Sequence, residues 1–299
     1  MPPRLPILPV ALALLLLGGC GSDTAITEPG AADTTVTDAL GRAVTFRHPP
    51  ARVLPLAPNL TEVAFAVGAG DRIAAVSPSD DYPAAVAALP HFSTFPLDPE
   101  AVVALEPDLL LATDQVNHPA DVAPFADLGI PTYFFSFVRV ADVPAALRTA
   151  GALLGGDGEP AARDFEARVD SVRRAVEGQP RPRTLLLVGD DVLYAFGRHS
   201  YASEAVRLAG GDNLTDAFAG QAAALSDEWV LERAPEVVVV LSEPYDPARL
   251  LERHPTWRNV PAVRDGRVYG LDPDLVSRPG PRLAEGIVRL AALLHDDGG

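Results

Sequence analysis

One long amphipathic helix in the middle of the chain constrains the fold more than any other feature. Residues 160–177 carry their larger apolar side chains at spacings of 4, 3 and 4, which places them on one side of an α-helix. These side chains are Phe165, Val169, Val172 and Val176. Eighteen helical residues span roughly 27 Å, about the width of a small domain. We interpret the helix as a rigid connector between two lobes; an ordinary surface helix of one larger domain is the alternative.

Strands and helices alternate on both sides of this connector. After a β-hairpin at 34–46, the N-terminal half predicts strands at 52–56, 72–76, 109–112 and 132–137. Its helices are expected to start at Thr61 and to cover 100–105, 120–128 and 143–154. The C-terminal half predicts strands at 184–188, 237–241 and 267–271, helices at 202–209, 226–233 and 282–294, and a helical stretch around 257–263. Uninterrupted apolar strands are typical of parallel sheets that helices cover on both faces, so the fold class is α/β.

The two halves share an internal repeat. Glu100, a short helix, the pair Pro107-Asp108 and a buried strand follow one another in the first half. The second half has the same order with Glu228 and the pair Pro235-Glu236, and each matching position is 128 residues further along. Several features in one register indicate that the same structural unit occurs once per lobe.

The N-terminus is typical of an export signal. A single arginine precedes an apolar run from Ile7 to Leu17, which is shorter than the about 20 residues that a membrane-spanning helix needs. The segment Leu17-Gly-Gly-Cys20 resembles the lipobox of bacterial lipoproteins, whose cysteine becomes the lipid-modified first residue. Cys20 is the only cysteine, so no disulfide can form within the chain. An ordinary signal peptide with an incidental cysteine is the alternative.

These features divide the chain into five predicted segments. They are a lipoprotein signal peptide at 1–19, a flexible tether at 20–33, an N-terminal α/β lobe at 34–156, the connecting helix at 157–180 and a C-terminal α/β lobe at 181–299. The tether is rich in small and polar residues without periodicity, as a flexible spacer would be.

Charge and motifs exclude several functions. A formal charge of −16 and an isoelectric point near 4.7 argue against binding of nucleic acid. The chain has no nucleophile elbow, no phosphate loop and no metalloprotease motif, and its Gly68-Ala-Gly70 follows a helix rather than a strand. Its six histidines are scattered, so a zinc or iron ion bound directly by the protein is not expected. We therefore expect a protein that captures and releases a ligand, not an enzyme, with no cofactor of its own.

Six motifs together resemble a known family. They are Arg52-Val-Leu-Pro-Leu-Ala-Pro58-Asn-Leu-Thr-Glu62, Asp80-Asp81-Tyr82-Pro83, Glu100 with Glu106-Pro107-Asp108-Leu, Ala209-Gly-Gly-Asp-Asn213, Leu225-Ser-Asp-Glu228 and Arg278-Pro-Gly-Pro-Arg282. They keep their order from about residue 34 to the end, and they are similar to the substrate-binding proteins of ABC importers for vitamin B12, iron siderophores and haem. Within that family the resemblance is nearest to the vitamin B12-binding members. It implies two Rossmann-like lobes joined by one long rigid α-helix, the helical-backbone fold of these proteins.

The resemblance also implies roles for individual residues. Glu100 and Glu228 fall where the family docks one glutamate per lobe onto arginines of the membrane permease, and a carboxylate can take a bidentate bond from an arginine. Both glutamates also sit in first helical turns, where the helix dipole favours an acid without any docking. By position, the residues around the ligand cleft are Pro58, Ser79, Phe95, Thr113, Tyr194, Ala222, Asp274 and Arg278.

The expected ligand is a corrinoid related to cobalamin. Phe95 and Tyr194 could pack on a flat macrocycle, and Arg278 could donate to groups on its rim. A ferric siderophore or haem is the alternative within the class, and an extracytoplasmic enzyme on the same scaffold is the alternative outside it. The expected partners are a small-molecule ligand, a permease dimer and a membrane reached through the lipid on Cys20. We expect a monomer in the cell envelope, outside the cytoplasmic membrane.

Overall fold

A computed structural model describes residues 32–296, and the predicted leader, tether and Cys20 lie outside this range or at its edge. The described chain opens with an antiparallel hairpin of β1 (Ala32–Thr37) and β2 (Ala43–His48), as the sequence predicts. Its turn is fixed by Asp38, whose carboxylate accepts the backbone N–H groups of Leu40 and Arg42 and pairs with the Arg42 guanidinium.

The N-terminal half is built on a three-stranded parallel sheet. Its order is β3 (Val53–Pro55), β4 (Leu109–Thr113) and β5 (Thr132–Phe135). The helices are α1 (Pro58–Ala66), α2 (Pro99–Ala104), α3 (Pro119–Asp127) and α4 (Asp142–Leu154). Helix α1 begins three residues before the expected Thr61, because Pro58 occupies the first helical position, where its missing N–H costs nothing.

The strand expected at 72–76 is wrong. Residues Gly70–Arg72 form a 3-10 turn (η1), and Ile73 and Val76 make only isolated bridges to Val53 and His91. The extended stretch ends at Ser77, whose N–H and hydroxyl both donate to the carboxylate of Asp80, at 2.8 and 2.6 Å. That side chain closes a turn in place of a continued ladder.

The C-terminal half contains a six-stranded sheet. Its order is β11 (Val268–Gly270), β10 (Val237–Val240), β6 (Arg183–Leu187), β7 (Tyr194–Phe196) and β9 (Ala222–Ala224), and the short β8 (Asp212–Asn213) also pairs with β6. Strands β6, β8, β10 and β11 are parallel, whereas β7 joins β6 and β9 antiparallel. The helices are α6 (Tyr201–Leu208), α7 (Asp227–Arg233), α8 (Ala248–Arg253), α9 (Pro261–Arg264) and α10 (Leu283–Leu294). Further 3-10 turns are η2 (Ala84–Ala88), η3 (Leu214–Ala217), η4 (Pro255–Asn259) and η5 (Pro273–Leu275).

The central strands of both sheets, β4 and β10, are buried on both faces, and the period of two along each strand separates the faces. Leu109 and Leu111 of β4 point into a cluster with α1 and α4, while Leu110 points into another cluster around Phe125 of α3. Strand β10 alternates in the same way. Val237 and Val239 point into the first cluster, whereas Val238 and Val240 point into a third cluster under α7, α8 and α9. The first cluster therefore continues from one half to the other, between the two sheets.

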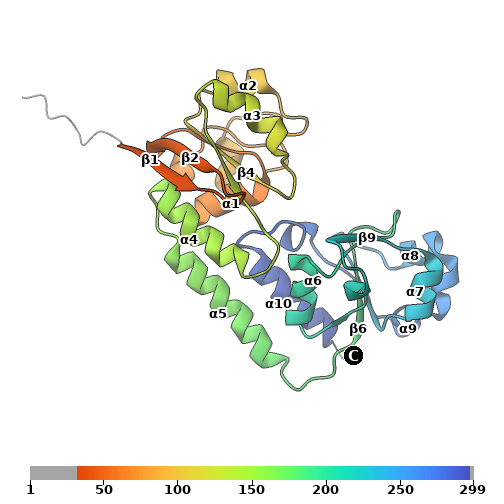
Figure 1. The fold of residues 1–299 in the computed structure, drawn as a ribbon. Coiled ribbons are helices and arrows are strands. Elements are labelled where there is room, and N and C mark those ends of the chain that lie inside the picture. Colours follow the sequence, from red (N-terminus) through yellow and green to blue (C-terminus); the bar gives the residue numbers. More distant parts are fainter. Residues whose placement is uncertain (1–31, 297–299) are drawn as a thin grey trace, which may run out of the picture. The chain divides into compact units, whose positions relative to one another are not determined.

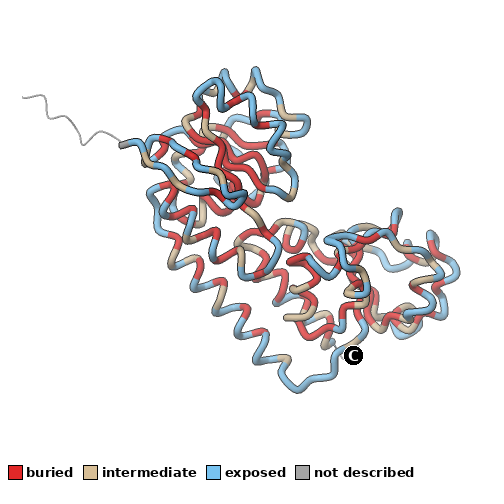
Figure 2. The backbone as a smooth tube through the Cα atoms, in the orientation of Figure 1, coloured by how far each residue is buried: buried red, intermediate tan, exposed pale blue. Residues whose placement is uncertain are grey.

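Helix α5 (Glu159–Ala175) runs along this shared cluster, beside α4 and α10 (Figure 1). It begins one residue before the expected start and ends two residues early, with Val176 as its C-cap. Phe165, Val169 and Val172 are buried as predicted, and Val176 is partly buried against the same cluster. Buried and exposed residues alternate along the helix in Figure 2, as an amphipathic stripe requires. The prediction of two α/β halves joined by one long helix is confirmed.

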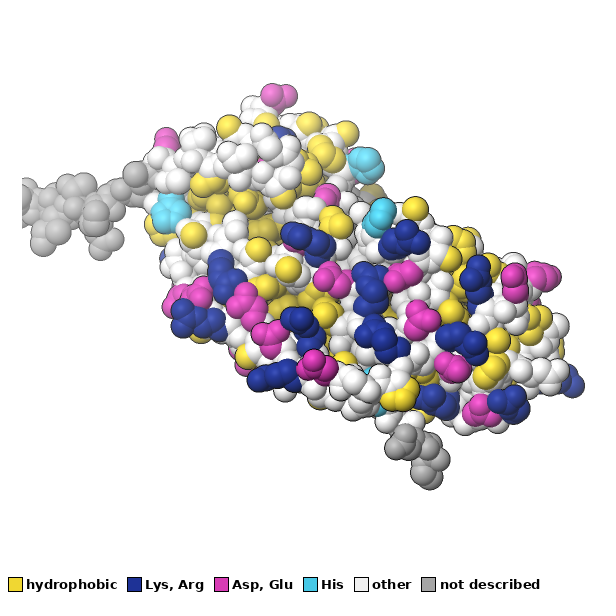
Figure 3. All heavy atoms as spheres, turned by 60° about the horizontal axis from the view of Figure 1, so that its bottom comes forward, with side chains coloured by type: hydrophobic (Ala, Val, Ile, Leu, Met, Phe, Trp, Pro, Cys, Tyr) yellow, Lys and Arg dark blue, Asp and Glu magenta, His cyan; other side chains and the backbone are white. Residues whose placement is uncertain are grey.

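The exposed side of α5 carries arginines paired with acids. Arg148 of α4 donates to Glu159 at 2.7 Å and makes a fork to Glu166 at 2.8 and 3.0 Å. Along α5 itself, Arg163 and Arg168 each pair with an acid four residues earlier. Figure 3, which brings the lower side of Figure 1 forward, shows basic and acidic side chains interspersed over that face.

The internal repeat extends to the ends of two helices. Asp98 caps α2 and Ser226 caps α7, each accepting a backbone N–H of the first turn, and these caps are also 128 residues apart. Just after each helix, Glu106 and Ala234 have the same left-handed backbone, with φ of 46°. The acids that follow the prolines are equivalent too: Asp108 accepts the N–H of Arg52, and Glu236 accepts that of Arg183. The sequence repeat is therefore a structural repeat that places α2 and α7 in the same way on their sheets.

Candidate functional site

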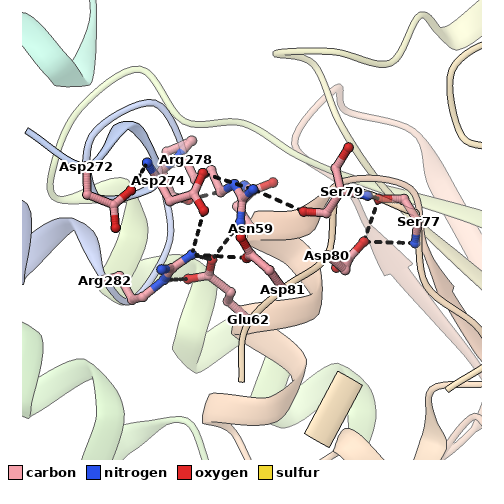
Figure 4. Close-up of polar contacts among 11 residues, drawn as sticks. Asn59, Glu62, Ser77, Ser79, Asp80, Asp81, Asp272, Asp274, Arg278 and Arg282 are labelled. Carbon is pink, nitrogen blue, oxygen red and sulfur yellow. Dashed lines mark hydrogen bonds and ion pairs between the residues drawn. The ribbon is translucent and has the colours of Figure 1, made fainter. Parts of the chain in front are cut away.

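Five charged side chains from both halves meet in one cluster, which we call the inter-lobe cluster (Figure 4). Three are carboxylates and two are arginines: Glu62 of α1, Asp81 of the loop before η2, Asp274 of η5, and Arg278 and Arg282 of the segment leading into α10. The two arginines come from the C-terminal half, whereas Glu62 and Asp81 come from the N-terminal half. The cluster therefore joins segments that lie about two hundred residues apart in the sequence.

Glu62 and Arg282 form the buried part of this cluster. Arg282 Nη2 donates to Glu62 Oε1 at 2.7 Å and its Nε donates to Oε2 at 3.1 Å, which is a two-bond fork. The Glu62 side chain is 1% exposed and that of Arg282 is 15% exposed. Arg282 also lies over the Tyr82 ring, with its guanidinium carbon 4.6 Å from the ring centroid. These contacts fix the start of α10 against α1.

Arg278 forms the more open part of the cluster. Its Nη1 donates to Asp81 Oδ1 at 2.7 Å, and its Nη2 donates to the Ser79 carbonyl at 3.0 Å. The same Nη2 lies 2.9 Å from Asp274 Oδ1. Asp81 is 58% exposed, so this part of the cluster faces solvent. A neighbouring backbone contact, Asn59 Nδ2 to the Pro279 carbonyl at 3.2 Å, holds the loop between the two arginines on the first turn of α1.

Burial and neighbouring charges separate the acidities of the three carboxyl groups. Burial raises the pKa of Glu62, and the bonds from Arg282 offset part of that rise. Burial, together with a hydrogen bond to Asp81, raises the pKa of Asp274. Burial also acts on Asp81, but the hydrogen bonds to Arg278 and Asp274 outweigh it and lower the pKa of Asp81. Asp274 is thus the carboxyl group of this pair that holds a proton more strongly.

Two of the residues expected around the ligand cleft, Asp274 and Arg278, lie in this cluster, and a third, Ser79, contacts it through its backbone carbonyl. Pro58 is close to it, since the adjacent Asn59 bonds to the loop that follows Arg278. In this structure the Arg278 guanidinium is thus occupied by Asp81, Asp274 and the Ser79 carbonyl, and Glu62 Oε1 lies 3.8 Å from its Nη1.

Within residues 32–296, the remaining expected cleft residues have no hydrogen bond or ion pair with the cluster. Phe95 is 92% exposed, in the loop between 94 and 97, and Tyr194 at the start of β7 is 44% exposed. Ala222 is exposed at the start of β9, where it pairs with Phe196 of β7. Thr113, at the end of β4, is only 1% exposed, and its N–H donates to Asn117. Two exposed aromatic rings, one from each half, thus remain free to meet a ligand.

The two glutamates expected to dock are both exposed in first helical turns. Glu100 lies in α2 and Glu228 in α7, on the outer layer of each half. Within residues 32–296 neither carboxylate has a hydrogen bond or ion pair. They are thus available to a partner.

The sequence motifs contained Glu62, Asp81 and Arg282, but these residues were not expected to contact one another. Glu62 and Arg282 are the last residues of their motifs, and Asp81 is the second residue of Asp80-Asp81-Tyr82-Pro83. The opposite charges of these residues were the sequence signal that could have indicated contacts among them.

Other features of the described residues carry less chemistry. No group of three or more His, Cys, Asp or Glu side chains in this part is arranged to hold a metal ion. The described helices include none with the length and apolarity required to cross a bilayer. A groove of about 390 Å³ runs beside the Glu62–Arg282 pair and is bordered by Tyr82 and Glu285.

A groove of about 810 Å³ lies elsewhere, at the C-terminal end of α5. Several of its arginines already have partners. Arg207 pairs with Asp216 at 2.7 Å, and Arg181 donates to the carbonyls of Arg207 and Gly211. These arginines of the groove are therefore held by neighbouring residues of the protein.

Comparison with known proteins places this arrangement in a family. The model of the periplasmic binding protein family matches residues 54–275. A vitamin B12-binding protein of Pectobacterium carotovorum is 30% identical over 239 residues, which cover 78% of this chain and 84% of that protein. An uncharacterised ABC transporter substrate-binding lipoprotein of Bacillus subtilis, YvrC, is 25% identical over 305 residues, covering 96% of this chain and 95% of that protein.

Solved structures agree with this placement. The periplasmic haem-binding protein BhuT, in complex with two haems, has a TM-score of 0.75 and 26% identity, covering 83% of this chain and 99% of that one. The periplasmic vitamin B12-binding protein BtuF of Vibrio cholerae has a TM-score of 0.69 and 25% identity, covering 82% and 97%. The class expected from the sequence motifs is confirmed. The matched region covers nearly all of both sheets and the whole of α5, and the chain belongs to the periplasmic binding protein family.

Proposed function

We propose that this protein is a lipid-anchored binding protein that captures a corrinoid ligand between its two halves and delivers it to the permease of an ABC importer. The relatives that bind vitamin B12 support the ligand class, and the substrate-binding lipoprotein of Bacillus subtilis supports the anchor and the importer. Cys20 would carry the lipid and hold the protein outside the cytoplasmic membrane.

The observation that carries the choice of ligand is the charge of the inter-lobe cluster. Its two arginines face three carboxyl groups, so no positive charge is left over for an anionic ligand. Haem carries propionates and ferric siderophores are often anionic, whereas the amide-bearing rim of a corrinoid can donate to Asp81 and Asp274 and accept from Arg278. The cluster therefore favours a ligand with neutral polar groups.

The exposed aromatic residues favour a flat ligand. Phe95 comes from the N-terminal half and is 92% exposed, and Tyr194 comes from the C-terminal half and is 44% exposed. Aromatic rings gain from offset stacking or edge-to-face packing against another flat ring system, such as a macrocycle.

The exposed glutamates Glu100 and Glu228 support delivery to a permease. They occupy equivalent positions of the structural repeat, each in the first turn of an outer helix that is capped in the same way. A pair of subunits related by two-fold symmetry could bind one glutamate each through arginine side chains.

The test is to identify the ligand directly. Mass spectrometry of the purified protein is expected to reveal a corrinoid, and titration with cobalamin is expected to quench tryptophan fluorescence without any turnover. Trp229 and Trp257 both belong to the C-terminal half and provide the signal. Tight binding of haem or of a ferric siderophore, with no response to cobalamin, would contradict the corrinoid assignment and support the alternative ligand. Chemical conversion of the ligand would contradict the binding-protein assignment itself.

A further inference from the structure

The outer helices α2 and α7 each expose one aliphatic side chain beside a glutamate (Figure 1). Val103 of α2 is 42% exposed and Leu231 of α7 is 39% exposed. The two lie at equivalent positions of the internal repeat, because 231 − 103 equals the 128 residues that separate Glu100 from Glu228. Each aliphatic residue follows its glutamate by three positions, so the two side chains are neighbours on the helix, with Cβ atoms about 5–6 Å apart.

The exposed faces of α2 and α7 are alike because the two helices are anchored alike. Val102 and Val230 are fully buried, in the second and third hydrophobic clusters. The next residue along each helix is the exposed aliphatic one. Within residues 32–296, neither Val103 nor Leu231 is part of a hydrophobic cluster. The two helices therefore present an acid and an adjoining apolar group to the outside in the same way.

Packing within the protein does not account for this arrangement. A single exposed aliphatic side chain is common on a soluble protein and needs no explanation. Here two such side chains occupy equivalent positions of a repeat, each beside a glutamate. In the part of the chain that the structure describes, the carboxylates of Glu100 and Glu228 have no hydrogen bond or ion pair. Each face thus has an unused charge and an unused apolar group side by side.

The charge around the first face fits a basic protein partner. Residues 73–138 contain no lysine and no arginine. Within this stretch, α2 and α3 expose Glu100, Asp121 and Asp127. These acids would repel an anionic membrane surface and also a second copy of the same face. The partner that fits is therefore a protein surface that presents an arginine or a lysine next to an apolar pocket.

The second face has a similar balance of charges. Helix α7 exposes Glu228 and Glu232, whereas the guanidinium of Arg233 lies over the Trp229 ring, 5.7 Å from its centroid. A partner that meets both helices thus meets the same combination of acid and aliphatic group twice. A pair of identical subunits related by two-fold symmetry can match it with one kind of surface, used once by each subunit.

We propose that Val103 and Leu231 are the apolar component of the docking surface, and that each inserts into a pocket beside the permease arginine that pairs with its glutamate. The glutamates supply orientation and long-range attraction. The aliphatic side chains supply affinity through burial, which does not depend on the charges. The paired surface follows from the structural repeat, whereas the identity of its partner as a permease rests on the proposed function.

The first test identifies what the two side chains contact in the cell. The photo-crosslinking amino acid p-benzoylphenylalanine is placed at position 103 or at position 231, one at a time, in cells that lack the native copy. Mass spectrometry of the crosslinked product is expected to identify the same permease polypeptide from both positions. Position 288 is the matched control, because Val288 of α10 is 43% exposed and lies outside the repeat. Two different polypeptides, a second copy of this chain or the absence of a crosslink would overturn the proposal.

The second test removes the apolar character of the two side chains and nearly keeps their size. Val103→Thr combined with Leu231→Asn is expected to reduce uptake of labelled cobalamin about tenfold, because neither side chain then gains from burial. Val103→Ile combined with Leu231→Met restores the apolar groups and should transport several times better than the polar variant. Val288→Thr is the control for the loss of an exposed valine elsewhere. Equal uptake by the polar variant and the wild type would contradict the apolar contact.

The two tests distinguish this inference from the proposed function. The crosslinks need no ligand, so a protein that crosslinks from both positions but does not bind cobalamin would refute the ligand assignment alone. A different pattern would refute the apolar contact and keep the binding function. In that pattern cobalamin binds, Glu100→Ala combined with Glu228→Ala stops uptake, and Val103→Thr combined with Leu231→Asn transports normally.

Discussion

The carboxylate of Glu62 and the guanidinium of Arg282, 220 residues apart in the sequence, join the two halves of the protein by two hydrogen bonds of 2.7 and 3.1 Å. This pair lies beside the shared hydrophobic cluster, and its carboxylate is almost fully buried. Helix α5 connects the halves covalently, whereas Glu62 and Arg282 fix them at a second point. Two attachments restrict the rotation of one half relative to the other far more than a single attachment does.

Removing one member of this pair should destabilise the protein strongly. Arg282→Ala leaves the Glu62 carboxylate buried without its main partner, and we expect the free energy of unfolding to fall by about 3 kcal/mol. Urea denaturation measures this change. Arg289→Ala is the control, since its pair with Glu285 is half exposed and should contribute at most about 0.5 kcal/mol. Equal losses in the two variants would contradict a special role for Arg282.

Asp81 and Asp274 are expected to change the stability of the protein with pH in opposite directions. The pKa of Asp274 is raised above its ordinary value of 3.8, so its contribution to stability is present below that value and is lost as the pH rises through the folded-state pKa. The pKa of Asp81 is lowered, so its contribution is present above 3.8 and is lost as the pH falls through its folded-state pKa. We therefore expect Asp274→Asn to gain stability relative to wild type as the pH rises from acid to neutral, and Asp81→Asn to lose it.

Denaturation series between about pH 3 and about pH 7 measure these slopes. Asp71→Asn, in an exposed turn, is the control for the removal of one negative charge. Slopes of the same sign in the two variants would contradict the opposite pKa shifts of Asp81 and Asp274.

Removing the two docking glutamates is expected to stop transport without weakening ligand binding. Glu100→Ala combined with Glu228→Ala should abolish uptake in cells and leave ligand affinity unchanged, because both side chains lie in outer helices and not in the inter-lobe cluster. Uptake of labelled cobalamin and equilibrium titration of the purified protein measure the two quantities. Glu232→Ala, an exposed acid in the same helix α7, is the matched control and should transport normally. Normal uptake by the double variant would remove the docking role.

The exposed aromatic rings are expected to contribute to the affinity for the ligand. Tyr194→Ala should weaken cobalamin binding about tenfold, because a ring that packs on a macrocycle contributes on the order of 1 kcal/mol beyond its buried area. Phe95→Ala should act similarly. Val192→Ala, an exposed residue in the loop before Tyr194, tests whether the loop alone matters and should change affinity little. Isothermal titration provides the measurement, and unchanged affinity in both aromatic variants would place the ligand elsewhere.

Helix α5 predicts a small motion on binding. It is unbroken from Glu159 to Ala175 and packs on α4 and α10, so no hinge loop lies at the crossing between the halves. X-ray scattering with and without ligand should therefore give nearly equal radii of gyration. A large compaction on binding would mean that the connection bends.

Long periodic segments could be predicted from the sequence, and short ones could not. The stripe of α5 and the apolar strands β4, β6 and β10 appear within two residues of their expected ends, because burial on defined faces leaves a periodic record in the sequence. Strands β7 and β9 were not expected, since three-residue strands such as Ala222–Ala224 contain no β-branched residue and depend on their neighbours for pairing. The extended stretch after Arg72 was expected as a strand, but the Ser77–Asp80 turn ends it.

The candidate site was predicted only in part. Arg278, Asp274 and Ser79 were expected together near the cleft, and they do meet. The partner of Arg282 was not identified, because an ion pair across 220 residues leaves no local spacing to detect. The roles of Phe95, Tyr194 and the docking glutamates remain predictions.

The crossing from one sheet to the other has a consequence for how such chains can evolve. Among the described residues, every strand of the first sheet precedes α5 and every strand of the second follows it, so each half is an uninterrupted stretch of sequence. A recombination event within the codons for α5 could therefore exchange one complete half for that of a relative and leave both sheets whole. The recombinant would inherit its ligand contacts from two parents, and its halves would fit only if an acid and an arginine still met beside the helix.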